Sequence, residues 1–111
     1  MGHNTREPSN LEVLERFWRR SPFHDQEIRE ITALNRRVVI RLKEMSLVIM
    51  GAGDLKRCEL PAVWLYESIV QEGGGLILDV QTDTGQIRVT GADVRLIRNS
   101  DLAVLVPPID T

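Results

Sequence analysis

The sequence predicts a mainly β domain (α+β): a small antiparallel β-barrel or sandwich of about six strands with one N-terminal amphipathic helix. From residue 27 onward, apolar and polar residues alternate with the period of two that strands show. Short clusters of glycine, asparagine, aspartate and proline separate these runs. Only one segment has a helical period, and parallel neighbours need crossover connections, so an antiparallel sheet is favoured.

The helix is predicted over residues 10–20, after a disordered tail at residues 1–8. Ser9 and Glu12 have the spacing of a capping box, which satisfies early backbone amides at a helix start. Pro22 disfavours a helical conformation at the residue before it and ends the element. The apolar residues of this segment recur at helical spacing, namely Leu11, Leu14, Phe17 and Trp18.

Strands are predicted in "EIREITAL" and "RRVVIRLKE", joined by a turn at Asn35, since asparagine tolerates a left-handed backbone. "MSLVIM" is expected to continue the second strand or to pair with it, and "GAGD" at 51–54 to form a loop. Pro61 cannot donate to a ladder and predicts an edge, a bulge or a break between short strands.

The clearest local signal is a hairpin in "LILDVQTDTGQIRV", whose "TDTG" supplies turn residues. Residues 91–93 are expected to turn into a third strand, "VRLIR", which gives a three-stranded meander. "QEGGG" at 71–75 is interpreted as a mobile connection, and "LAVLV" as a short strand before two prolines. We expect one β-rich domain over residues 9–106 and a C-terminal tail at 107–111.

The composition of the chain limits which kinds of partner it can bind and in which compartment it is expected to work. The chain is 42% hydrophobic and 27% charged, with a net charge of -2, so no general attraction to nucleic acid or to an anionic membrane is expected. No apolar run approaches the roughly 20 residues that span a bilayer. The single cysteine, Cys58, allows no internal disulfide, and a cytoplasmic location is predicted. Nucleic-acid binding through the arginines is the weakest alternative.

The richest chemical cluster is "FHDQEIRE", which contains His24, Asp25, Glu27 and Glu30. One interpretation is a site for proton transfer or for a ligand or metal held by nitrogen and oxygen. Strand spacing would place Asp25 and Glu27 on one face and His24 on the other, which weakens a joint site. The interpretation that we favour is structural: Asp25 caps the turn after Pro22, and His24 bonds to a backbone group.

Trp64 and Tyr66, in "AVWLYESI", are two residues apart and are expected to share one strand face. Exposed together, they would form an aromatic platform for a protein or ligand. Buried together, they would be core, which we favour for Trp64 because large rings are mostly buried.

Three segments, "PFHDQEIREI", "LPAVWLYESI" and "LILDVQTDTGQIRVTGADVRLI", occur in an order that resembles small bacterial β-rich proteins with a Phe-His-Asp motif at the start of the domain. The similarity spans about residues 22–97. It implies a bacterial origin and a β-rich domain of the kind found in immunity or interaction modules, and it implies no catalytic residue.

The sequence therefore predicts a non-enzymatic interaction module, with an unknown protein partner or self-association through an edge strand. No catalytic residue, metal ligand or cofactor is assigned. His24, Asp25, Glu27, Trp64 and Tyr66 are the candidate interaction or ligand residues. The alternative is a small-molecule or metal-binding protein, with hydrolysis as one option, that uses the region of His24, Asp25 and Glu27.

Overall fold

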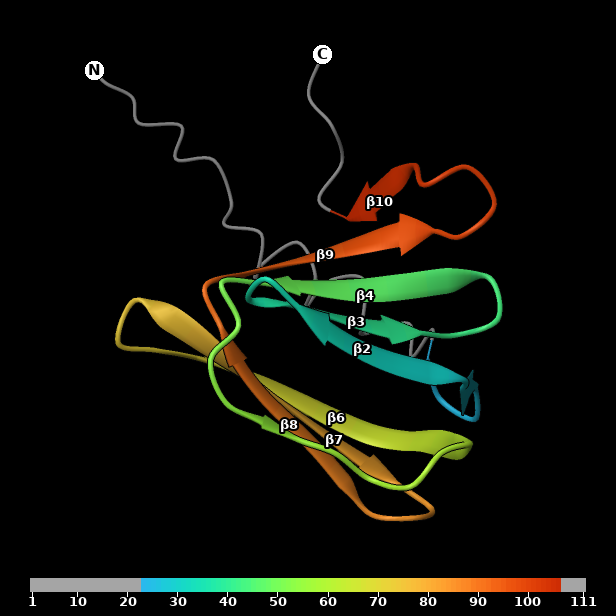
Figure 1. Cartoon of the computed structure of the whole chain (residues 1–111). Helices are drawn as coiled ribbons and strands as arrows, with labels where there is room; N and C mark the ends of the chain where they lie inside the picture. Colours follow the sequence, from blue (N-terminus) through green and yellow to red (C-terminus); the bar gives the residue numbers. More distant parts are fainter. Residues whose placement is uncertain (1–22, 107–111) are drawn as a thin grey trace, which may run out of the picture.

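The computed structural model describes residues 23–106, which form two antiparallel sheets packed face to face (Figure 1). One sheet, here the β6 sheet, has the strand order β1-β6-β7-β8-β5, and the other, the β4 sheet, has the order β10-β9-β4-β3-β2. The strands are β1 (Glu27–Ile28), β2 (Glu30–Leu34), β3 (Arg37–Arg41), β4 (Met45–Met50), β5 (Leu55–Lys56), β6 (Ala62–Glu72), β7 (Gly75–Thr82), β8 (Gln86–Gly91), β9 (Asp93–Arg98) and β10 (Val104–Val106).

The mainly β, antiparallel fold predicted from the sequence is confirmed, with ten strands among residues 23–106 in place of about six. The predicted helix at residues 10–20 and the predicted tails at residues 1–8 and 107–111 lie outside the described residues. The last described strand ends at Val106, as expected. Within residues 23–106 there is no helix, and hence none with the length and apolar character needed to span a bilayer.

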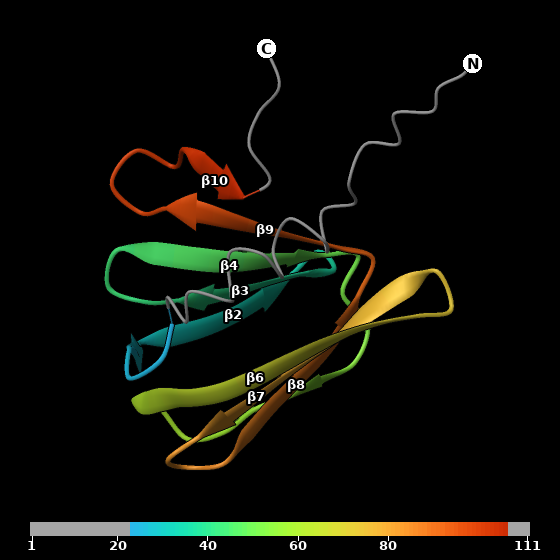
Figure 2. The ribbon, with the colours of Figure 1, turned by 180° about the vertical axis from the view of Figure 1, so that it is seen from behind.

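The core lies between the two sheets, and Figure 2 shows the two layers from behind. Strands such as β7, β8 and β9 contribute alternate side chains to it, as the pleat requires. The largest fully buried side chains come from both sheets, from the turn before β1 and from the β3–β4 connection: Trp64, Phe23, Ile28, Ile40, Leu42, Leu47, Ile49, Leu78, Ile87, Leu96 and Val80.

The chain passes from one sheet to the other within almost continuous strands. β1 and β2 belong to different sheets and are separated only by Arg29, and β8 and β9 only by Ala92. The predicted meander is therefore wrong: β9 pairs with β4 of the other sheet rather than with β8. At this corner a Cβ on Gly91 would lie 2.4 Å from Cγ2 of Ile49, so only glycine fits so close an approach.

Two tight turns set the register of the strand pairs that they connect, β2 with β3 and β6 with β7. Asn35 and Arg36 both have positive φ, 52° and 58°, and connect β2 to β3 as the sequence predicts. Gly73 and Gly74, with φ of 59° and 81°, connect β6 to β7 in the same way. "QEGGG" is thus the end of β6, a two-residue hairpin turn and the first residue of β7, rather than a longer connection between strands.

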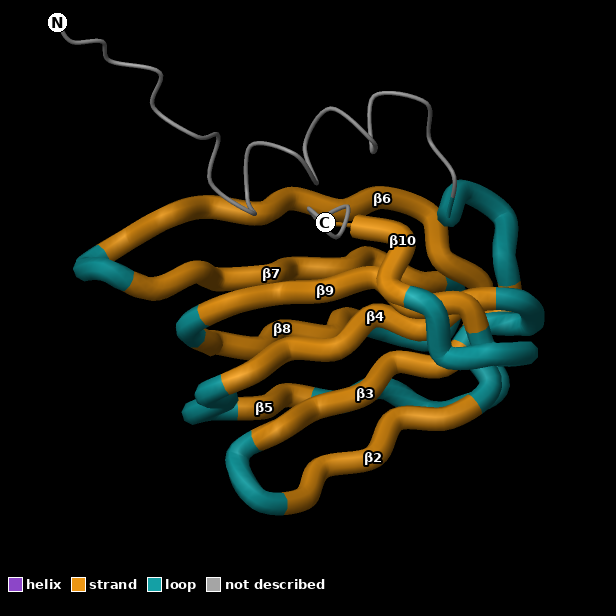
Figure 3. Tube along the Cα trace, turned by 90° about the horizontal axis from the view of Figure 1, so that it is seen from above, coloured by secondary structure: helices purple, strands orange, loops and turns teal. Residues whose placement is uncertain are grey.

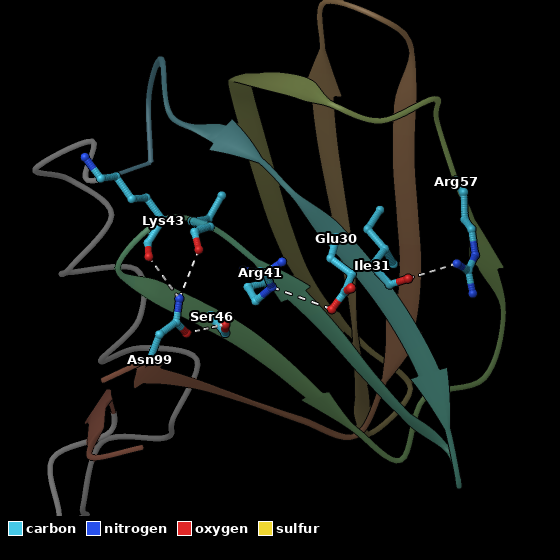
Figure 4. A network of polar contacts seen from close by, with 8 residues as sticks. Glu30, Ile31, Arg41, Lys43, Ser46, Arg57 and Asn99 are labelled. Carbon is cyan, nitrogen blue, oxygen red and sulfur yellow. Dashed lines mark hydrogen bonds and ion pairs between the residues drawn. The ribbon is translucent and has the colours of Figure 1, made fainter. Parts of the chain in front are cut away.

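Side-chain bonds hold the loop ends of the β4 sheet together (Figure 4). The amide Nδ2 of Asn99 donates to the carbonyls of Leu42, at 2.9 Å, and Lys43, at 3.3 Å. The hydroxyl of the buried Ser46 donates to Oδ1 of Asn99 at 2.6 Å. The β9–β10 loop is therefore fixed to the β3–β4 turn. On the other side of the molecule, Nη1 of Arg57 donates to the carbonyl of Ile31 at 3.0 Å.

Candidate functional site

The Phe-His-Asp motif forms a turn that lies against the first residues of β6. The amide of Asp25 donates to the carbonyl of Trp64 at 2.8 Å, and the amide of Trp64 donates to the carbonyl of Gln26 at 2.9 Å. The amide of Gln26 closes the turn on the carbonyl of Phe23 at 3.0 Å. Phe23 is fully buried beside Trp64, with 4.8 Å between the ring centroids. The turn and β1 together therefore cover only the start of the β6 edge.

His24 bonds to a backbone group, as the structural interpretation of the motif predicts. Its Nδ1 donates to the carbonyl of Leu65 at 2.8 Å, because a carbonyl can only accept. Its Nε2 lies 3.6 Å from Oδ1 of Asp25, and its ring centroid lies 6.2 Å from that of Tyr66. The expectation that His24 and Asp25 occupy opposite faces is wrong, because both residues lie in a turn that precedes the first strand.

Asp25 contributes its backbone conformation to this turn. Its φ is 66°, in the left-handed region that aspartate tolerates better than most residues. Its side chain is 74% exposed, so the carboxylate makes little contact with the protein.

Asp25→Ala is therefore expected to lower the free energy of unfolding by about 1 kcal/mol, because alanine is strained at positive φ. Asp25→Gly removes the same carboxylate without that strain, and it is expected to cost less. Thermal unfolding of the two variants beside the parent protein measures the difference. Equal losses in both variants would show that the carboxylate, and not the backbone, matters here.

Glu27 does not join His24 and Asp25 in a common site. Its Oε1 lies 3.6 Å from Nε of Arg29, and both side chains are about half exposed. A surface hollow of about 400 Å³ lies nearby, and both acidic and basic side chains line it: Asp25, Gln26, Glu27, Arg29, Lys43 and Glu44. Among residues 23–106, no three histidine, cysteine or carboxylate side chains come together as a metal-binding group.

Trp64 and Tyr66 do not share a strand face, because β6 has a bulge between them. Trp64 pairs with Thr82 and Tyr66 with Gln81, so the extra residue is Leu65. Trp64 is fully buried, which confirms its predicted place in the core, whereas Tyr66 is 67% exposed on the outer face. Neither a joint platform nor a joint core exists. The carbonyl that the bulged Leu65 turns outward is the one that accepts from His24.

Beyond Leu65, β6 has an edge that no other described strand covers. Its neighbours in the sheet are β1 and β7, and β1 pairs only with Ala62 and Val63. Figure 3 shows β6 along the outside of its sheet, with the β6–β7 hairpin projecting past the turns of the other sheet. Sequence reasoning did not identify this edge, since it depends on the order of strands in space.

The hairpin turn determines which backbone groups point outward from this edge. A two-residue turn joins Glu72 and Gly75, so these residues form a hydrogen-bonded pair, and the pairing alternates along the ladder. Tyr66, Ser68 and Val70 therefore bond to β7. The amides and carbonyls of Glu67, Ile69 and Gln71 point away from β7, and no backbone group among residues 23–106 bonds to them.

The side chains beside this edge are partly apolar. Tyr66 and Val70 lie on the outer face of β6, and Val70 is 50% exposed. Ile77, opposite Val70 on β7, is half-buried. Ile69 faces inward and packs against the core. These residues give an added strand apolar contacts on both faces of the sheet.

Comparisons of the chain with protein-family models, with curated proteins and with solved structures found no match. The assignment of function therefore depends on the geometry of the His24 turn and of the β6 edge.

Proposed function

We propose that the chain is a non-enzymatic protein-interaction module of the bacterial cytoplasm, and that it binds an extended segment of a partner along the outer edge of β6. The observation that carries this proposal is the row of outward backbone groups at Glu67, Ile69 and Gln71. Strand addition uses such a row for affinity and uses alternate side-chain contacts for specificity.

The open edge of β6 is bounded at both ends, which limits the length of the partner segment that can pair with it. The His24 turn occupies the edge up to Leu65, and the Gly73–Gly74 turn ends the strand at Glu72. A partner strand would therefore lie between these two turns, where Tyr66 and Val70 flank it.

The other candidate functions have less support. A small-molecule or metal site at His24, Asp25 and Glu27 would need a free Glu27 carboxylate, which instead lies beside Arg29. Nucleic-acid binding would need a positive surface. Within the described part of the chain, five arginines lie within 4.0 Å of a carboxylate, which reduces their field: Arg29, Arg41, Arg88, Arg95 and Arg98.

A proline substitution tests the proposal, because proline removes an amide donor from the edge. Gln71→Pro removes an outward amide of β6 and leaves the β6–β7 ladder intact. Ala33→Pro is the matched control, because Ala33 is exposed and its amide points outward from β2, at the edge of the other sheet.

The experiment captures bacterial lysate proteins on the immobilised parent chain and on both variants, and identifies them by mass spectrometry. Proteins held by the parent and by Ala33→Pro are expected to be lost from Gln71→Pro. A captured set that is unchanged by Gln71→Pro would overturn the role of the β6 edge. Circular dichroism verifies that each variant is folded.

A further inference from the structure

We infer that a second copy of this chain fits the β6 edge, through antiparallel pairing of the two β6 strands about a two-fold axis at Ile69. This inference rests on the proposed function, in that it names the partner of the same edge. The two β6 sheets would then join into one continuous sheet. An unpaired edge is a known template for such pairing.

The register follows from the outward residues. In antiparallel pairing, only residues whose amide and carbonyl both face the partner form hydrogen-bonded pairs. With the axis at Ile69, Ile69 faces its own copy, and Glu67 faces Gln71 of the second copy. All three outward residues of each chain then enter the new ladder.

Neighbouring registers use fewer of these groups. A slide by two residues in one direction brings Gln71 opposite Leu65, whose carbonyl already accepts from His24. A slide in the other direction brings Glu67 opposite Gly73, which lies in the hairpin turn. Each of these registers places one outward residue of β6 opposite a residue that cannot form both hydrogen bonds with it, so the axis at Ile69 is preferred.

The side chains in the preferred register are compatible on both faces. On the inner face, the Glu67 carboxylate lies opposite the Gln71 amide, which can donate to it. On the outer face, Tyr66 lies opposite Glu72, and Ser68 lies opposite Val70. No carboxylate faces a carboxylate directly, which avoids the destabilising like-charge pair of sheets.

The mass in solution is the first test. Light scattering after size-exclusion chromatography is expected to show the parent rising with concentration from 12.6 kDa, the mass of one chain, toward twice that value. Ala33→Pro is expected to behave in the same way and Gln71→Pro to stay at the lower mass. A parent that remains a monomer at the highest attainable concentration would overturn the inference.

Cysteine cross-linking tests the register and does not depend on how the proline variants fold. Ser68→Cys and Val70→Cys are each made in a Cys58→Ser background, because Cys58 is a free thiol. Directly opposite residues of a non-hydrogen-bonded pair lie about 4.5 Å apart between Cα atoms, within the range for a disulfide.

Mixing the two variants under oxidation is expected to give a cross-linked dimer, whereas each variant alone gives none. Cross-linking of Ser68→Cys alone, or no cross-link in the mixture, would overturn the register. If the parent is monomeric and Gln71→Pro still loses captured lysate proteins, the self-pairing fails while the proposed function stands. If the parent dimerises and no captured protein depends on Gln71, the edge serves self-association alone.

Discussion

Trp64→Ala is expected to lower the free energy of unfolding by about 3–5 kcal/mol, the range for removal of a large buried aromatic side chain. Trp64 is 0% exposed, its ring lies 4.8 Å from that of Phe23, and its Nε1 donates to Oε1 of Glu67 at 3.1 Å. Its removal leaves a cavity between the sheets and weakens the packing that fixes the Phe-His-Asp turn. Because domains are stable by only about 5–15 kcal/mol, this is a large fraction of the total.

Urea unfolding followed by circular dichroism measures this loss. Trp64→Phe keeps an aromatic ring and loses the bond to Glu67, so a smaller loss is expected. Tyr66→Ala, on the exposed face of the same strand, is expected to change stability by less than about 0.5 kcal/mol. Similar losses for Trp64→Ala and Tyr66→Ala would contradict the assignment of opposite faces across the bulge.

Gly91→Ala is expected to cost about 1–3 kcal/mol through overpacking. The added Cβ would lie 2.4 Å from Cγ2 of Ile49 and 3.3 Å from the carbonyl oxygen of Met50. Ile49 is fully buried on the central strand of its sheet, so neither atom can move away freely. The overpacking would strain the corner between β8 and β9, where the chain passes from one sheet to the other.

Thermal unfolding of a double-mutant cycle separates this clash from other effects. Ile49→Ala removes the methyl group that the new Cβ would meet, at its own cost of about 2–5 kcal/mol. The destabilisation of Gly91→Ala combined with Ile49→Ala is expected to be less than the sum of the single losses. Strict additivity would locate the effect of Gly91→Ala in its backbone and not in the contact with Ile49.

Features that depend on neighbouring residues were predictable from the sequence. The Asn35–Arg36 turn joins strands that are adjacent both in the chain and in the sheet, and its positive φ values suit asparagine. The β7–β8 hairpin was predictable for the same reason, because its two strands are also adjacent both in the chain and in the sheet. Pro61 stands directly before β6, where it breaks the run as expected.

Features that depend on distant residues were not predictable. The bulge at Leu65 is held by His24, 41 residues away, and nothing in "AVWLYESI" indicates it. Gly91 suggests a turn, whereas its actual requirement is the approach of Ile49 from another sheet. The backbone contact of His24 was predicted, since polar residues in turns favour such bonds, but its partner strand was not.

Because β4 pairs with β9, which is synthesised much later, one edge of β4 stays uncovered while the chain is being synthesised. β2, β3 and β4 are consecutive and can pair as soon as they leave the ribosome, but Met45 of β4 has its partner at Arg98. Strand pairing between residues that are far apart in the chain forms late in folding. Until it forms, an uncovered strand edge can pair with the wrong strand and lead to misassembly. β4 is therefore open to wrong pairing in the nascent chain, although it is the central strand of its sheet in the finished protein.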